Sequence, residues 1–221
     1  MLLLLFFSRA KAEERTGVLK RLFNDKELII EVSGSSYQTI NGTKQLTKPE
    51  YAVYPWDKSY DWCSNCAHSY SRMPYITLYS NTKKIRFNSY FIRAGCCNER
   101  KCCCEDGYYS CFDCCLYSWS LQISDDNKTW STVHKVNKDT EMCRCKEKTY
   151  TLDQEYNSKY VRLIQNGAIP GYPPCISINK IELFGSSLKL GQDFNDDIID
   201  SYHDDDEDIS IIGHISKNSK D

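Results

Sequence analysis

Cysteine density constrains this chain more than any other feature of its sequence. The chain has 13 cysteines, and eight of them fall between Cys96 and Cys115. Such a run is typical of a disulfide scaffold or a thiolate metal site, and ordinary core packing does not explain it. Because 13 is odd, a monomer that forms only intramolecular disulfides must leave one thiol over.

The composition predicts a folded body followed by an acidic tail. With 221 residues, 41% of them hydrophobic, the chain is large enough to bury a core. The net charge of −2 hides an asymmetry, because 10 acidic but only 3 basic residues lie from position 186 to the end. The small basic surplus of the remainder is too diffuse to indicate a nucleic-acid partner. We expect one domain at residues 16–186 and a disordered acidic tail at 187–221.

The first 15 residues have two interpretations. Residues 2–7 are apolar, and Ala10-Lys11-Ala12 resembles a signal cleavage site, but the apolar run is short and no basic residue precedes it. The segment is either the remnant of a secretion signal, which implies a secreted or cell-surface protein, or an apolar tail on a cytoplasmic one. No stretch is long enough for a transmembrane span. Two triplets, 41–43 (NGT) and 127–129 (NKT), fit the N-glycosylation pattern.

Alternating apolar and polar residues predict an all-β fold. A short helix at residues 16–23, with Thr16 as its cap, precedes a series of strands. Since no helix separates consecutive strands, an antiparallel sandwich or barrel fits better than a parallel sheet. The apolar phase shifts between Ile178 and Ile181, which indicates a β-bulge. The expected strands are residues 28–32, 75–79, 84–93, 119–124, 130–136, 150–152, 160–165 and 176–184.

Three blocks resemble the coagulation factor V/VIII type C, or discoidin, family. Residues 85–95 (IRFNSYFIRAG) are similar to the family strand that ends in Arg/Gln-x-Gly. Residues 119–130 (WSLQISDDNKTW) resemble its Trp-to-Trp hairpin, which is the most specific of the three. Residues 160–163 (YVRL) and 179–185 (NKIELFG) resemble its last two strands. The blocks occur in the family's order and cover about half of the chain.

The resemblance implies a galactose-binding-like jelly-roll sandwich that is not an enzyme. Such modules bind glycans, phospholipid headgroups or protein surfaces through loops at one end of the sandwich. Trp119, Trp130 and Arg162 match family positions with a structural role. The chain departs from the family in two ways: it lacks a cysteine pair bracketing the domain, and it carries a cysteine-rich insert at residues 95–117.

Counting strand directions predicts that all the cysteines lie at one end of the sandwich. Consecutive antiparallel strands run in opposite directions, so successive loops alternate between the two ends. Every cysteine then falls in a loop at the end that carries the family's ligand loops. In an oxidising compartment they would form disulfides. In the cytosol a tetrahedral zinc site is the alternative, and zinc is the one cofactor to consider. The spacing suits four ligands, Cys63, Cys66, Cys111 and Cys114.

The same loops carry aromatic and basic residues suited to a ligand. Aromatic rings pack on the apolar faces of a sugar while charged donors hold its hydroxyl groups, and the same pair of side-chain types suits an anionic phospholipid surface. The alternative for Trp56 and Trp62 is packing beneath the loops. The candidate contact residues are Trp56, Trp62, His68, Arg72, Arg100, Lys101, Tyr108, Tyr109, Phe112 and Tyr172.

An enzyme is the weakest of three classes. His68 lies close to Cys66 in sequence, but no zinc-protease, phosphate-loop or serine-hydrolase motif is present. His134 is expected to be incidental at a strand end. We predict a non-catalytic binding or adhesion module that recognises a carbohydrate or an anionic surface. The alternative is a protein–protein interaction module with zinc-clamped loops.

Overall fold

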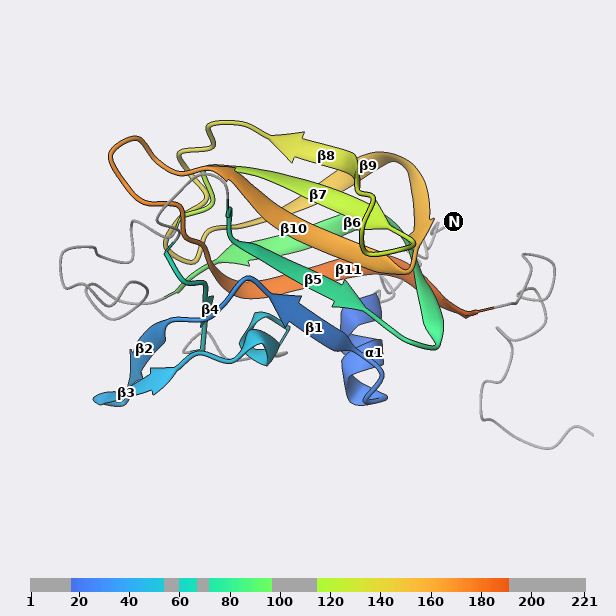
Figure 1. Cartoon of the computed structure of the whole chain (residues 1–221), viewed down its shortest axis with the longest axis horizontal. Coiled ribbons are helices and arrows are strands. Elements are labelled where there is room, and N and C mark those ends of the chain that lie inside the picture. The colour runs from blue at the N-terminus through green and yellow to red at the C-terminus, as the bar shows by residue number, and fades with distance from the viewer. Residues whose placement is uncertain (1–16, 54–59, 67–71, 97–114, 191–221) are drawn as a thin grey trace, which may run out of the picture. The chain divides into compact units, whose positions relative to one another are not determined.

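The computed structural model describes residues 17–53, 60–66, 72–96 and 115–190. Within them the chain forms the predicted antiparallel jelly-roll sandwich (Figure 1). Its elements are α1 (Val18–Asn24), β1 (Ile29–Val32), β2 (Tyr37–Ile40), β3 (Thr43–Leu46), the 3-10 turn η1 (Pro49–Ala52), β4 (Trp62–Cys63), β5 (Tyr75–Tyr79), β6 (Lys83–Ala94), β7 (Ser118–Ser124), β8 (Ser131–Val136), β9 (Glu147–Ser158), β10 (Tyr160–Gly167) and β11 (Ser177–Lys189).

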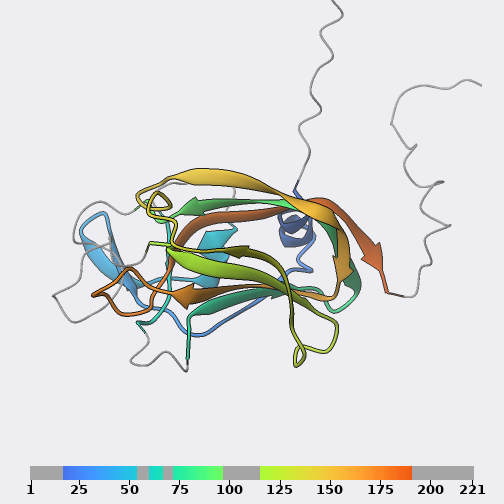
Figure 2. The same ribbon diagram turned by 90° about the horizontal axis from the view of Figure 1, so that it is seen from above.

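Two main sheets form the layers of the sandwich (Figure 2). One has five strands in the order β1-β5-β10-β7-β8, and the other has four in the order β4-β11-β6-β9. A separate hairpin pairs β2 with β3. All of these strand pairs are antiparallel, which confirms the alternation on which the loop assignment depends.

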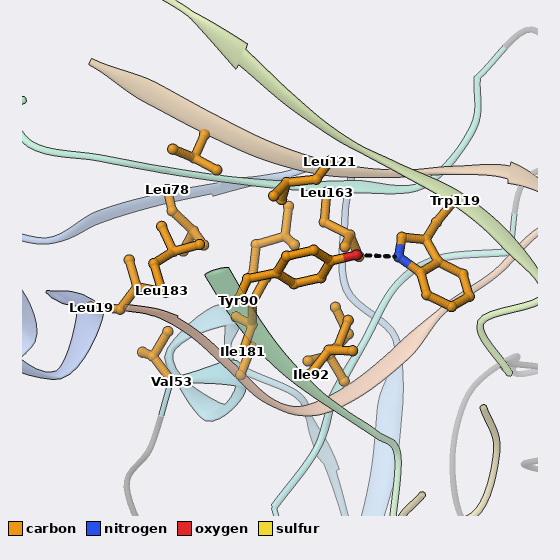
Figure 3. Packing of buried hydrophobic residues seen from close by; sticks show 14 of the residues in the cluster. Leu19, Val53, Leu78, Tyr90, Ile92, Trp119, Leu121, Leu163, Ile181 and Leu183 are labelled. Carbon is orange, nitrogen blue, oxygen red and sulfur yellow. Dashed lines mark hydrogen bonds between the residues drawn. The ribbon is translucent and has the colours of Figure 1, made fainter. Parts of the chain in front are cut away.

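The core lies between the two sheets, as the alternating strands require (Figure 3). Ile76 and Leu78 of β5 and Leu163 of β10 face it from one side, and Ile181 and Leu183 of β11 from the other; all five are fully buried. Trp119 is also fully buried, as its structural role in the family implies. Arg162 lies on the outer side, where its guanidinium stacks 3.8 Å from the centre of the Trp130 ring.

Bulges change which side chains face the core. The bulge predicted in the last strand is present, because the β11–β6 register shifts between Ile178 and Lys180. A second irregularity, between Phe87 and Ser89 of β6, was not predicted. Strict alternation assigns Phe87 and Ser89 to one face, but the shift turns Tyr90 inward instead, where it is fully buried.

The helix is capped by a side chain from β11. Thr16, the expected cap, lies outside the described residues, and the N-cap position is Gly17. The buried Glu182 carboxylate accepts the N–H groups of Leu19 at 2.8 Å and Lys20 at 3.1 Å. Burial raises the pKa of Glu182, although these N–H groups oppose that shift. A Cβ at Gly17 would overlap the Glu182 side chain, so glycine permits this close approach.

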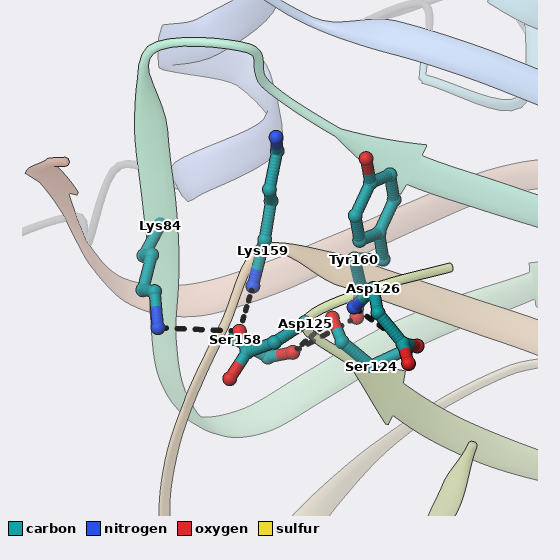
Figure 4. A network of polar contacts seen from close by, with 7 residues as sticks. All are labelled: Lys84, Ser124, Asp125, Asp126, Ser158, Lys159 and Tyr160. Carbon is teal, nitrogen blue, oxygen red and sulfur yellow. Dashed lines mark hydrogen bonds and ion pairs between the residues drawn. The ribbon is translucent and has the colours of Figure 1, made fainter. Parts of the chain in front are cut away.

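A polar network closes the β7–β8 hairpin (Figure 4). Asp126 accepts the N–H groups of Lys128 at 2.8 Å and Thr129 at 2.7 Å, and the Ser124 hydroxyl at 2.9 Å. These bonds lower the pKa of Asp126, with the backbone bond from Thr129 contributing most. The serine and aspartate of the family-like hairpin therefore have a structural role in this turn.

β11 ends at Lys189, three residues beyond the expected domain boundary at 186. The predicted N-terminal segment and most of the predicted acidic tail lie outside the described residues. In the part of the chain that the structure describes, no helix has the length and apolar character needed to cross a membrane.

Candidate functional site

The cysteines that the structure describes lie at one end of the sandwich, which we call the cysteine end. The ends of β6, β8 and β10 and the starts of β5, β7, β9 and β11 lie there, at the left of Figure 1, so the connections between these strands begin or end at this side. Cys63 pairs with Ser177 at the start of β11. Ala94, at the end of β6, pairs with Ile178 of the same strand. The described cysteines of this end are Cys63, Cys66, Cys96, Cys115, Cys143, Cys145 and Cys175.

Two disulfides tie neighbouring connections together. Cys96, just after β6, is bonded to Cys145, and Cys115, just before β7, is bonded to Cys143. The Cα–Cα distances are 4.3 and 4.8 Å. Cys96 and Cys115, the described residues on either side of 97–114, are thus bonded to the same short segment before β9. The two cross-links restrict the described bases of this connection, where a loop would have little apolar packing to hold it.

Backbone hydrogen bonds continue the ladder between these segments. The N–H of Cys145 donates to the carbonyl of Gly95 at 2.8 Å, and the N–H of Leu116 donates to Met142 at 3.2 Å. Gly95 is the glycine of the family-like Arg-x-Gly block. A Cβ at this position would overlap the Ser177 hydroxyl, so glycine lets β6 and β11 meet at the base of the cysteine end.

A buried carboxylate holds the start of the β6–β7 connection. Both oxygens of Asp61 accept the N–H of Cys96, at 2.9 and 3.1 Å, and one also accepts Asn179 Nδ2 at 2.9 Å. Asn179 occupies the β11 bulge, which directs its amide toward Asp61. A buried carboxylate needs such partners, so Asp61 specifies the position of the loop base. Sequence reasoning did not single out Asp61; Asn179 was included in the family-like block 179–185 and lies where the apolar phase of the last strand breaks.

Tyr172 is presented on a tight turn of the β10–β11 connection. The carbonyl of Ile169 accepts the N–H of Tyr172 at 3.0 Å, and Pro170 and Gly171 fill the two central positions. The φ of Gly171 is +91°, as a type II turn requires. Tyr172 is 39% exposed. Pro170 and the hydrogen bond between Tyr172 and Ile169 restrict this backbone, so Tyr172 has a defined position on the turn.

Arg72 is exposed in the segment that leads into β5, at the same end of the sandwich. It and Tyr172 are the predicted contact residues that the described structure brings to the surface of the cysteine end. The other predicted contacts, apart from Trp62, lie outside the described residues. They are Trp56, His68, Arg100, Lys101, Tyr108, Tyr109 and Phe112.

Trp62 is a core residue. Its side chain is fully buried in β4, and its Nε1–H donates to the Ser35 hydroxyl at 3.1 Å. Trp62 therefore packs in the core, which was the alternative to a ligand contact. The expectation that its ring faces a ligand is corrected. The physical reason is that β4 pairs with β11 and points the ring into the space between the sheets.

The structure favours disulfides over zinc at the cysteines it describes. Cys66, one of the four expected zinc ligands, is disulfide-bonded, and a sulfur in a disulfide is not a thiolate ligand. Cys63 is buried, with its sulfur 3.6 Å from the Ser177 hydroxyl, while Cys111 and Cys114 lie outside the described residues. No cluster of three His, Cys, Asp or Glu side chains suited to a metal occurs among the described positions.

His134 has a structural role that the sequence did not reveal. Its Nδ1 lies 2.8 Å from the Tyr90 hydroxyl, which accepts Trp119 Nε1–H at 3.3 Å. The Tyr90 ring also stacks on Tyr150, with centroids 4.9 Å apart. With Trp119 donating to it, the Tyr90 hydroxyl is satisfied when it donates to an unprotonated Nδ1. This network therefore favours neutral His134.

Acidification is expected to destabilise the fold through His134. Burial lowers the pKa of His134 from its ordinary value of 6.5; Asp153 opposes this shift and Lys148 adds to it. The unfolded chain then binds more protons near pH 6, so the stability conferred by neutral His134 is present above pH 6.5 and falls as the pH drops. Urea midpoints from about pH 8 to about pH 5 measure this slope. His134→Gln should flatten it; an unchanged slope would assign the effect to other groups.

Comparison with solved structures identifies the fold. One similar structure is CBM32-5 of CpGH89 from Clostridium perfringens, determined in complex with GalNAc-β-1,3-galactose: TM-score 0.52, 11% identity, covering 77% of this chain and 100% of that one. Another is the family 32 module of C. perfringens NanJ in complex with galactose: TM-score 0.50, 9% identity, covering 77% and 98%. This chain has the discoidin-type fold of family 32 carbohydrate-binding modules.

A further module with this discoidin-type fold, CBM32-3 of a C. perfringens family 31 glycoside hydrolase, aligns with a TM-score of 0.50 at 12% identity, over 73% of this chain and 92% of that one. No family model and no curated protein matches the sequence. The likeness is therefore one of fold, and it confirms the jelly-roll expected from the three sequence blocks.

Proposed function

We propose that this chain is a non-catalytic module that binds a carbohydrate at its cysteine end. The observation that carries the proposal is the convergence of four connections at one end, two of them tied together by the Cys96–Cys145 and Cys115–Cys143 disulfides. Cross-linked loop bases lower the entropy that a binding surface loses when it engages a ligand. The similar structures with bound galactose and GalNAc-β-1,3-galactose support a sugar as the ligand class.

Tyr172 and Arg72 supply the two kinds of contact that a sugar needs. Tyr172, which is 39% exposed, can offer the apolar surface of its ring to the C–H face of a pyranose, and its turn restricts its position. Arg72 is an exposed residue, and an arginine guanidinium offers several N–H donors to ring hydroxyl oxygens. Each contact is modest alone, so we expect weak affinity for a single sugar.

Three ionisable groups that the structure describes, the buried Asp61 and Glu182 and the half-buried His134, have structural partners, which supports a binding role. Asp61 accepts bonds from Cys96 and Asn179, Glu182 caps α1, and His134 is bonded to Tyr90. A catalytic acid or base must instead reach the proton it transfers.

Replacing Tyr172 with alanine is expected to weaken binding of galactose-terminated glycans by about tenfold, because loss of an aromatic platform costs about 1.4 kcal/mol. Titration calorimetry with galactose and GalNAc-β-1,3-galactose measures the effect, and Arg72→Ala should weaken the same titrations. Tyr37→Ala is a matched control: Tyr37 is also 39% exposed, but it lies on β2, outside the four connections. Binding of anionic phospholipid vesicles with no glycan binding would contradict the proposal.

A further inference from the structure

Both glycosylation triplets of the sequence lie at exposed hairpin tips. Asn-x-Ser/Thr occurs at Asn41 and Asn127 and nowhere else in the 221 residues. The first is the tip of the β2–β3 hairpin, and the second lies in the turn between β7 and β8. All three residues of each triplet are exposed. An acceptor asparagine has to project from the folded surface to carry an oligosaccharide, and both positions meet this requirement.

The local backbone at Asn41 leaves room for a large substituent. Ile40 pairs with Thr43, so Asn41 and Gly42 alone form the two-residue turn. Their φ values of +50° and +80° are those of the type I′ turn that Asn-Gly favours. A Cβ built on Gly42 meets no atom within 4 Å, so the space beside Asn41 is open.

Asn127 is presented in a similar way at the opposite end of the sandwich. Its φ is +57°, and Asp126 fixes the turn by accepting the N–H groups of Lys128 and Thr129. Nδ2 of Asn127 lies 3.4 Å from Glu31 Oε2. A glycosylated amide keeps one N–H, which can preserve this contact. The turn projects at the right of Figure 2, away from the β2–β3 hairpin.

The disulfides provide an independent indication of the compartment. Cys96–Cys145 and Cys115–Cys143 require an oxidising environment such as the secretory pathway, where N-glycosylation also takes place. From the exposed tips and the disulfides together, we propose that Asn41 and Asn127 are N-glycosylation sites. The glycan at Asn127 would lie at the end remote from the cysteine end and leave that end accessible.

The modification is a glycosyl transfer from a polyprenyl-diphosphate-linked oligosaccharide. The bond between the sugar C1 and the phosphate oxygen breaks, and the polyprenyl diphosphate leaves with its electron pair. A new bond forms between C1 and Nδ2 of the asparagine, and Nδ2 loses one proton. No oxidant or reductant takes part.

Intact mass tests the proposal on the full chain, expressed behind a cleavable secretion leader in a eukaryotic host. We expect two N-linked glycans, removed by peptide N-glycosidase with conversion of Asn41 and Asn127 to aspartate. Thr43→Ala and Thr129→Ala should each remove one glycan while keeping the asparagine of the turn, and Thr→Ser at either position should restore it.

Asn81 is the internal control for exposure alone. It lies in the exposed turn between β5 and β6, but Lys83 occupies the position two residues later, so peptide mapping should find it unmodified. Secreted and cell-retained pools are both analysed, so that poor export does not hide a modified chain. Unmodified Asn41 and Asn127 in both pools would overturn the proposal, and modification of one alone would overturn it for the other.

Discussion

Replacing Cys96 and Cys145 together with serine is expected to lower the free energy of unfolding by about 4 kcal/mol. The two cysteines are 49 residues apart, and the loop that their disulfide closes restricts the unfolded chain strongly. In the folded protein the same disulfide attaches the end of β6 to the segment before β9. Both cysteines are changed so that no unpaired thiol is left to form a new bond.

The inner disulfide is expected to contribute a similar but smaller amount. Cys115 and Cys143 are 28 residues apart, for which loop closure predicts about 3.5 kcal/mol. Because this loop lies within the outer one, the four-serine variant should lose less than the sum of the two pairwise losses. Urea unfolding of the three variants measures these differences.

Reductant is the control for the two disulfide variants. It removes the bond from the parent chain, so the difference in stability between the parent and each variant should shrink when both are reduced. A Cys96→Ser/Cys145→Ser variant as stable as the oxidised parent would show that this disulfide does not stabilise the cysteine end. Glycan titrations on the same variants then show whether fixed loop bases also contribute to affinity.

The strands that sequence reasoning located well are those with strong alternation. The expected strand at 75–79 coincides with β5, and the hairpin around Asp126 was recognisable from its turn residues. β9 was expected at only three positions because this edge strand is mostly exposed, with Tyr150, Leu152 and Ser158 as its buried residues. An exposed strand has little apolar periodicity in its sequence. The extent of β9 is set instead by its pairing with β6.

The candidate site was predictable in outline and not in detail. Strand direction alone placed Cys96 and Cys145 at one end, because an antiparallel sandwich leaves few alternatives. Which aromatic residues face solvent was not predictable, since loop residues have no period from which to read a face. Tyr172 lies on the surface because a Pro-Gly turn places it there. Trp62 is buried because β4 pairs with β11.

Trp62→Ala is therefore expected to act on stability. Removing a fully buried tryptophan leaves a large cavity between the sheets and costs about 4 kcal/mol. For a domain of this size that loss corresponds to a fall in Tm of roughly 10 °C. Thermal unfolding followed by circular dichroism measures the shift. In molecules that remain folded, affinity for galactose-terminated glycans should be close to that of the parent chain.

Two smaller changes separate packing from hydrogen bonding at Trp62. Ser35→Ala removes the acceptor for Nε1–H while keeping the ring, and should cost about 1 kcal/mol. Trp62→Phe keeps part of the buried ring volume and should fall between the other two variants. A Trp62→Ala chain with unchanged Tm and lost glycan binding would instead make Trp62 a ligand contact. Because its ring is fully buried against the core, the expected order of destabilisation is Trp62→Ala, then Trp62→Phe, then Ser35→Ala.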